Sequence, residues 1–409
     1  MGMRKRALRM TDYTRGIFLG AALLCAGGGG SAALAQNAPT APAYSAPSEE
    51  SARVSRQSGA SDAVSRYLAA PEPAKPAPVP LDKPDPTLQQ VATPNIVNNP
   101  YENYLTLSYE NDLIGGSSDR YYTSGVRLTW FGTKTDVPEF IDDIAEVVPT
   151  FEVNETTSTY FTFGQNMYTP ADINIAANQA NDRPWAGWLY GSVGLVSMSG
   201  NHMDDFEITL GMVGPASLAE QTQKMIHRHL TDSPMPKGWS NQLKNEPGLI
   251  LSWQRRWPSL WALDFGVADL RLAAAPSVNV SLGNVYTYGG TGISFTLGPY
   301  QNTLQDTPPR VRPAIAGSGY FDTPDSNWSW YLFGGLDGRA VARNIFFDGN
   351  SFRDSHSVDK KILVGDAFAG LAFSLYDYRL AYTLNYRTPE FDGQEKEAVF
   401  GSLSLTARF

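Results

Sequence analysis

Short runs in which apolar and polar residues alternate recur along the chain from residue 101 to its end. Each run is roughly ten residues long and is bounded by Gly, Pro, Asn or Asp, as membrane-spanning β-strands are. The clearest runs are 105–110, 126–131, 206–210, 249–253, 278–282, 328–332, 380–386 and 400–409. An apolar face opposite a small or polar face predicts an all-β protein, a transmembrane antiparallel β-barrel with lipid outside.

A soluble β-sandwich would also alternate, but its strands are usually shorter and its aromatic residues fewer than the 20 Tyr, 19 Phe and 9 Trp of this chain. The last run ends at Phe409, and a final amphipathic strand with a terminal aromatic is typical of outer-membrane barrels. An exposed apolar edge strand is the alternative, and it would promote aggregation. We count about thirteen runs, and because bacterial single-chain barrels have even numbers of strands, we expect 12 or 14.

Two segments precede the predicted barrel. Residues 1–35 pass from basic residues through a short apolar stretch to Ala33-Leu34-Ala35, which predicts a secretory signal peptide. An uncleaved anchor is the alternative, but the apolar stretch is short and rich in Gly. Residues 36–97 are rich in Ala, Pro and Ser without a lasting period, which predicts a disordered linker. We therefore expect the barrel domain at 98–409, in the bacterial outer membrane.

Composition and charge exclude several classes of function. A formal net charge of −9 argues against nucleic acid as a partner. The single Cys lies inside the predicted signal peptide, which excludes a disulfide scaffold and a Cys-rich metal site. The sequence contains no G-x-S-x-G nucleophile elbow, no H-E-x-x-H and no P-loop.

One segment departs from the strand pattern and predicts a short helix in a loop. Gln221 to Leu230 has helical character, and Ser217 with Glu220 predicts a capping box that starts the helix near Leu218. Gln223 and His227 are four residues apart, so they share one helix face. His229 lies about 200° around the helix from His227. A solvated loop histidine is the alternative to a functional His227.

Oxygen-bearing side chains gather around the first predicted hairpin. Glu110-Asn111-Asp112 ends the first strand, residues 115–118 form a turn, and residues 119–125 begin the second strand. Asn111, Asp112 and Thr123 are therefore expected near one rim of the barrel. Such groups suit a hard cation such as Ca²⁺. Ordinary turn chemistry is the alternative, since Asn and Asp are common in turns.

The order of the motifs resembles the LpxR-type lipid A 3′-O-deacylase family of outer-membrane barrels. The resemblance covers roughly residues 101–409. Its motifs are Glu110-Asn111-Asp112, 119–125, Asp182-Arg183-Pro184-Trp185-Ala186-Gly187-Trp188, 211–215, 223–228, Gly238-Trp239 with Asn245-Glu246-Pro247, and Leu282-Gly283-Asn284. The loop 174–181 contains no Lys or Arg, although the phosphates of lipid A would favour cations.

The resemblance implies a twelve-stranded barrel whose site lies on the outer-leaflet side, between the wall and loop helices. It implies Ca²⁺-dependent hydrolysis of the ester that links the 3′-acyloxyacyl chain to lipid A. His227 then corresponds to the general base, Gln223 to a polar residue one turn before it, and Asn111, Asp112 and Thr123 to a polar cluster. Asn111 and Asp112 would help to hold the metal.

The expected partners are lipid A, or lipopolysaccharide, and the lipids of the outer membrane, and we expect a monomer. Two other functions remain open from the sequence. One is a non-catalytic barrel, either a porin or a structural protein. The other is a barrel-type phospholipase with a serine nucleophile.

Overall fold

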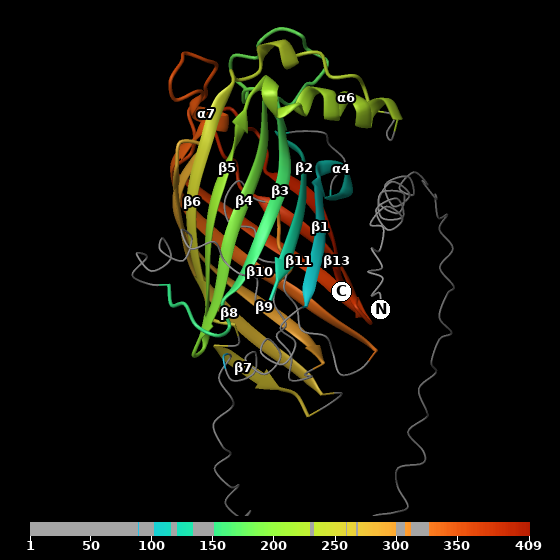
Figure 1. The fold of residues 1–409 in the computed structure, drawn as a ribbon. Coiled ribbons are helices and arrows are strands. Elements are labelled where there is room, and N and C mark those ends of the chain that lie inside the picture. The colour runs from blue at the N-terminus through green and yellow to red at the C-terminus, as the bar shows by residue number, and fades with distance from the viewer. Residues whose placement is uncertain are drawn as a thin grey trace, which may run out of the picture. The chain divides into compact units, whose positions relative to one another are not determined.

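Strands dominate the structure, and short helices lie between them (Figure 1). The computed structural model describes residue 89 and residues 102–115, 121–133, 151–229, 233–258, 260–266, 269–299, 307–311 and 327–409. The elements are β1 (Asn103–Asn111), α4 (Asp112–Gly115), β2 (Tyr121–Gly132), β3 (Ser158–Thr169), β4 (Ala186–Ser199), β5 (His202–Val213), η2 (Pro215–Ser217), α6 (Ala219–His229), η3 (Trp239–Asn241), β6 (Glu246–Arg256), β7 (Trp261–Asp264), β8 (Leu270–Gly283), β9 (Tyr286–Pro299), β10 (Trp328–Asn344), α7 (Ile345–Asp348), β11 (Leu363–Leu375), β12 (Tyr378–Arg387) and β13 (Ala398–Arg408).

The strands form one closed antiparallel sheet, in the order β6-β5-β4-β3-β2-β1-β13-β12-β11-β10-β9-β8-β7. An additional pairing of β6 with β8 closes the barrel, with Ile250 opposite Gly283. β7 lies along the next stretch of the same edge of β8, with Trp261 opposite Ala274. Thus β6 and β7 follow one another along the same position in the wall. The thirteen strands therefore occupy twelve positions, which confirms the predicted twelve-stranded barrel.

The interruption between β6 and β7 has a local cause. Trp257 still continues the ladder, since its N–H donates to the carbonyl of Pro276 at 3.0 Å. Pro258 follows and has no N–H to donate, so the ladder stops and resumes at Trp261. A strand broken in this way counts as two strands although it fills one position.

The predicted alternation is confirmed in the strands, and all eight sequence runs lie within strands apart from the terminal Phe409. β12 shows the pattern most clearly. Its exposed residues are apolar or aromatic and include Leu380, Tyr382 and Leu384, and its buried residues are mainly polar and include Arg379, Thr383 and Asn385. The apolar set faces lipid, and the polar set lines the lumen.

Several charged side chains inside the barrel form ion pairs. Arg127 Nη2 lies 3.2 Å from Glu207 Oε2, and both side chains are buried. Asp366 forms ion pairs with two arginines, since its carboxylate lies 2.7 Å from Arg339 Nη1 and 2.7 Å from Arg387 Nε. Pairing offsets the cost of removing these charges from water, so they can line a closed lumen.

A stretch of the connection between β9 and β10 also lies in the lumen. Residues 307–311 are largely buried, and the N–H of Val311 donates to Glu110 Oε1 at 2.7 Å. Arg310 forms an ion pair with Asp337 of β10. Because Glu110 belongs to β1, this stretch crosses the interior between distant strands.

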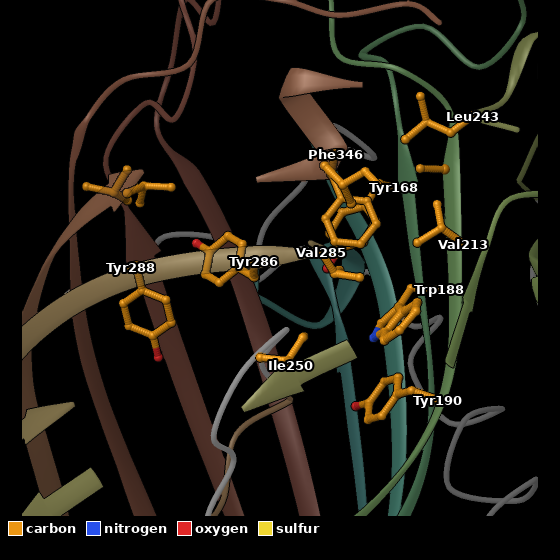
Figure 2. Packing of buried hydrophobic residues seen from close by; sticks show 14 of the residues in the cluster. Tyr168, Trp188, Tyr190, Val213, Leu243, Ile250, Val285, Tyr286, Tyr288 and Phe346 are labelled. Atoms are coloured by element: carbon orange, nitrogen blue, oxygen red, sulfur yellow. The ribbon is translucent and has the colours of Figure 1, made fainter. Parts of the chain in front are cut away.

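An aromatic cluster fills the barrel near the ends of the strands that lead to α6 and α7 (Figure 2). Tyr168 of β3 stacks on Phe346 of α7 with their ring centroids 4.1 Å apart. Trp188 is accommodated by two glycines, because a Cβ at Gly211 or Gly248 would lie 2.6 or 2.5 Å from its ring. The interior is therefore packed at this end.

The predicted signal peptide, 1–35, and the predicted linker, 36–97, lie outside the described residues, with the exception of Gln89. The N–H of Gln89 donates to the carbonyl of Gly200, and the N–H of Gly200 donates to Gln89 Oε1, both at 2.9 Å. Gly200 lies in the turn between β4 and β5, at the opposite end of the barrel from α6. No helix among the described residues is long and apolar enough to cross a membrane.

Candidate functional site

The predicted loop helix is present as α6, and it starts just after Leu218, as expected. The predicted capping box is wrong. Leu218 is the residue whose carbonyl accepts the first helical bond, from the N–H of Thr222, and Ser217 lies one residue too early. The Ser217 hydroxyl donates instead to the carbonyl of Gly214, at 2.6 Å, within the short helix η2. Packing of Ser217 against β4 therefore overrides the local capping signal.

α6 lies at the end of the barrel where β3 ends and β4 begins, and it contacts both strands (Figure 1). Gln165 of β3 donates from Nε2 to the carbonyl of Ser217 at 2.6 Å. A Cβ at Gly187 of β4 would overlap Ala219, so the start of α6 rests directly on the strand backbone. Gln165 shares its face of β3 with Phe163, which is 59% exposed, and this face is the outer one.

Gln223 and His227 lie on the buried face of α6, as their spacing predicted. Gln223 is 1% exposed and His227 is 8% exposed. Met225, between them in sequence, is 55% exposed, and His229 is exposed as well. The helix therefore presents Gln223 and His227 together, toward the wall and the neighbouring loop.

Two hydrogen bonds fix these side chains. Trp239 of η3 donates from Nε1 to Gln223 Oε1 at 2.7 Å. His227 Nδ1 lies 2.6 Å from the carbonyl oxygen of Pro234. A carbonyl only accepts, so Nδ1 carries the hydrogen and Nε2 of the neutral ring is left as an acceptor. We call Gln223, His227, Trp239 and Pro234 the α6 site.

Asn111 and Asp112 lie at the same end of the barrel, where β1 passes into α4. Both are buried, and Asn111 is opposite Ser124 of β2. α4 packs closely on β13, because a Cβ at Gly115 would overlap the backbone of Phe400. The two residues are therefore held at a fixed corner of the wall.

Thr123 lies in β2 at an irregularity of the ladder. Tyr122 is opposite Tyr168 of β3 and Ser124 is opposite the adjacent Met167, so Thr123 is the extra residue of a β-bulge. Bulges of this kind occur often beside active sites. Asp119 and Arg120, which belong to the same sequence motif, lie outside the described residues.

The structure brings these predicted residues together in two groups. Gln223 and His227 form one group on α6, and Asn111 and Asp112 form the other at the end of β1. Thr123 lies on β2, between β1 and the strand β3 over which α6 begins. At about 4.8 Å per strand, β1 and β3 are roughly 10 Å apart.

The donors at the β1 corner fit Ca²⁺ by their chemistry. An amide oxygen and a carboxylate are hard ligands of the kind that Ca²⁺ takes, together with backbone carbonyls and water. In the described ranges, no three His, Cys, Asp or Glu side chains gather in a way that could hold a metal. Asn111 and Asp112 are the described residues of this corner that would help to hold such an ion.

The connection before β4 carries a cation that is directed inward. The guanidinium of buried Arg183 lies 4.7 Å above the rings of both Tyr168 and Phe347. Burial lowers the pKa of Arg183 from its ordinary value, and the nearby Glu390 acts in the opposite direction. Arg183 therefore does not supply the surface cation that loop 174–181 lacks.

Two contributors to the α6 site were not predicted from the sequence. Trp239 belongs to a motif that was noted, but its partner Gln223 is separated from it by a loop. Pro234 acts through its backbone carbonyl, which no residue pattern identifies. A buried indole N–H usually has a hydrogen-bond acceptor, and this is the one property of Trp239 from which a polar partner could have been expected.

A family model described as outer membrane protein LpxR matches residues 86–409. The solved structure of LpxR from Salmonella typhimurium is 20% identical, with a TM-score of 0.62 over 74% of this chain and 99% of that chain. The β domain of the Bordetella autotransporter BrkA is 10% identical, with a TM-score of 0.37 over 76% of this chain and 99% of that chain. No curated protein sequence matches the chain.

The family model confirms the predicted family and the location in the outer membrane, and the LpxR structure confirms the barrel fold. The assignments of individual site residues and of Ca²⁺ remain predictions. Since the family model spans well over half of its length, this chain belongs to the LpxR family of outer membrane proteins.

Proposed function

We propose that this protein removes the 3′-linked acyloxyacyl chain from lipid A by hydrolysing its ester, with His227 as the general base and Ca²⁺ as the cofactor. Membership of the LpxR family supports the general function, which is that of an outer-membrane lipid A deacylase. The observation that supports the finer part is the fixed imidazole of His227. Its Nδ1 is bound to the carbonyl of Pro234, and the ring is buried on the outer side of the wall.

The position of α6 suits a lipid substrate. The outer surface of β3 below the helix carries exposed Phe161 and Phe163, which face the hydrocarbon of the membrane. A lipid in the surrounding leaflet can keep its acyl chains beside these residues while its ester reaches the α6 site. The packed lumen gives a soluble substrate no such route, and this disfavours a porin.

The proton transfers follow from the orientation of His227. Nε2 accepts a proton from water as the water oxygen attacks the ester carbonyl, and the carbonyl oxygen becomes an oxyanion. Ca²⁺, held with the help of Asn111 and Asp112, would supply positive charge to that oxyanion when bound. Nε2 then returns the proton to the departing 3′-oxygen. The products are a free acyloxyacyl acid and a sugar hydroxyl, and His227 is neutral again.

The remaining predicted residues have supporting roles in this proposal. Gln223 is buried one helical turn before His227 on the same face of α6, where it could hydrogen-bond to a water molecule at His227 Nε2. The backbone of Thr123 lies in the bulge of β2, and we assign Thr123 to the polar cluster of the site because the family resemblance implies it. Water is the nucleophile in this scheme, so no serine is required.

The decisive experiment compares His227→Ala with His229→Ala. Outer membranes containing each variant would be assayed by mass spectrometry of lipid A for loss of the 3′ chain. Loss of a general base costs about 10²–10⁴-fold in rate, so His227→Ala should be nearly inactive. His229 is exposed on another face of α6, and His229→Ala should retain activity.

Folding is checked separately, by the faster migration of an unheated barrel on detergent gels. An inactive His229→Ala beside an active His227→Ala would reject the proposed base. A serine-directed inhibitor should leave the wild-type protein active, and inhibition would support the barrel-type phospholipase instead.

A further inference from the structure

The side-chain amide of Gln223 has one orientation, and Trp239 determines it. The indole Nε1–H can only donate, and it points at Gln223 Oε1 from 2.7 Å. The other end of the amide, Nε2, is therefore directed away from Trp239. Both side chains are 1% exposed, so water from bulk solvent does not compete for this bond.

Trp239 is itself confined by its surroundings. Its ring lies against Trp185, with the ring centroids 5.1 Å apart, in a cluster that also contains Met167, Ile173 and Ala219. The preceding Gly238 passes so close to Trp185 that a Cβ would overlap the indole. The indole N–H thus has little freedom to leave Gln223.

Gln223 Nε2 is buried and has no hydrogen-bond partner within the described part of the chain. A buried donor normally has an acceptor, so Gln223 Nε2 is available to donate to the oxygen of a water molecule or a ligand. His227 follows one turn later on the same face, and residues at this spacing have Cβ atoms about 5–6 Å apart. The two side chains therefore leave the helix side by side, and the oxygen of one water molecule between Gln223 Nε2 and His227 Nε2 would supply the acceptor that Gln223 Nε2 lacks.

We propose that Trp239 is a positioning residue, which orients the Gln223 amide so that Nε2–H holds the oxygen of the attacking water. This inference rests on the proposed function. The water accepts a hydrogen bond from Gln223, donates one to His227 Nε2, and keeps a lone pair for the ester carbonyl. Without Trp239 the amide can turn over, and its oxygen would then face the water oxygen.

The test is Trp239→Phe, which keeps an aromatic ring in the cluster and removes only the N–H. Groups that orient other active residues typically contribute about 10–100-fold, and we expect a fall of that size in kcat with KM little changed. Trp185→Phe is the matched control for packing, since it makes the same change in the same cluster and leaves the Trp239 N–H in place. Its kcat should fall much less than that of Trp239→Phe.

Two further variants separate orientation from packing. Gln223→Glu can still accept from Trp239 but has no second donor, so it should be as impaired as Gln223→Ala. The double variant Trp239→Phe with Gln223→Ala should be no worse than Gln223→Ala alone, because both changes remove one interaction. All variants should keep the heat-dependent gel shift.

Wild-type kcat in Trp239→Phe would overturn the inference, as would an equal loss in Trp185→Phe or multiplying effects in the double variant. An active His227→Ala would instead reject the proposed function as a whole. If His227→Ala is inactive and Trp239→Phe is fully active, only the positioning role is wrong.

Discussion

The lumen and the α6 site bury polar groups equally well but use different chemistry. Arg127 and Glu207 in the lumen are almost inaccessible and form an ion pair at 3.2 Å. In the α6 site an indole donates to an amide, and an imidazole faces a carbonyl. In an ion pair, each charge favours the ionised form of its partner. A neutral imidazole, in contrast, can accept a proton. We infer that the lumen contacts stabilise the barrel and that the α6 contacts orient groups for reaction.

Besides the loss expected for His227→Ala, a large effect is expected outside the lumen, at the β1 corner. Chelation of divalent cations should lower deacylation by about 10²–10³-fold, the usual cost of losing oxyanion stabilisation, and added Ca²⁺ should restore it. Asp112→Ala should lose activity to a similar extent without rescue by the same Ca²⁺ concentration. The measurement is release of the acyloxyacyl acid from lipid A in detergent micelles.

Asp264→Ala is the control for this prediction, because Asp264 is an exposed carboxylate on β7, away from α4 and α6. It should behave as the wild type. Full activity after chelation would contradict the role of the ion and leave the proposed base to be tested on its own.

A smaller effect, on stability and not on turnover, is expected inside the lumen. Glu207→Gln leaves the buried charge of Arg127 without its partner, and breaking such a pair costs about 3–5 kcal/mol of the free energy of unfolding. The temperature at which the fast-migrating band disappears should fall. The kcat of the folded protein at low temperature should not change.

Replacing both Arg127 and Glu207 by Met should recover much of that stability, since apolar replacements of a buried pair are often neutral. Tyr160 would keep its bond to Asp205, at 2.6 Å. A loss of kcat in Glu207→Gln without any change in thermal stability would contradict the inference that the lumen contacts serve stability and the α6 contacts serve the reaction.

The smallest effect is expected from the segment before the barrel. Deleting residues 40–85, with the signal peptide, its cleavage site and Gln89 retained, should leave assembly and activity unchanged. The composition of this segment gives it too little apolar area to fold alone. The amount of heat-modifiable protein in outer membranes measures the outcome, and reduced assembly would assign the segment a role beyond spacing.

Much of the barrel was predictable because each strand separates lipid from a polar interior. The alternation in β12 follows directly from that separation, and so does the buried face shared by Gln223 and His227 in α6. These are periodic features, and the period is present in the sequence.

Contacts that depend on how loops return to the barrel were not predictable. Residues 307–311 have the composition of a surface connection, but they cross the lumen to Glu110. Ser217 carries a capping signal, yet it packs against Gly187 in a different turn. Trp239 binds Gln223 across a loop, and no helical or strand periodicity in the sequence relates these two positions.

The placement of α6 on the outside of the wall determines how enzyme and substrate would meet. A lipid in the same leaflet arrives by lateral diffusion, so the encounter takes place in two dimensions. The relevant concentration is then the number of lipid A molecules per unit of membrane area. Diluting a suspension of vesicles would leave the rate per enzyme unchanged, whereas diluting lipid A with another lipid within each vesicle would lower it.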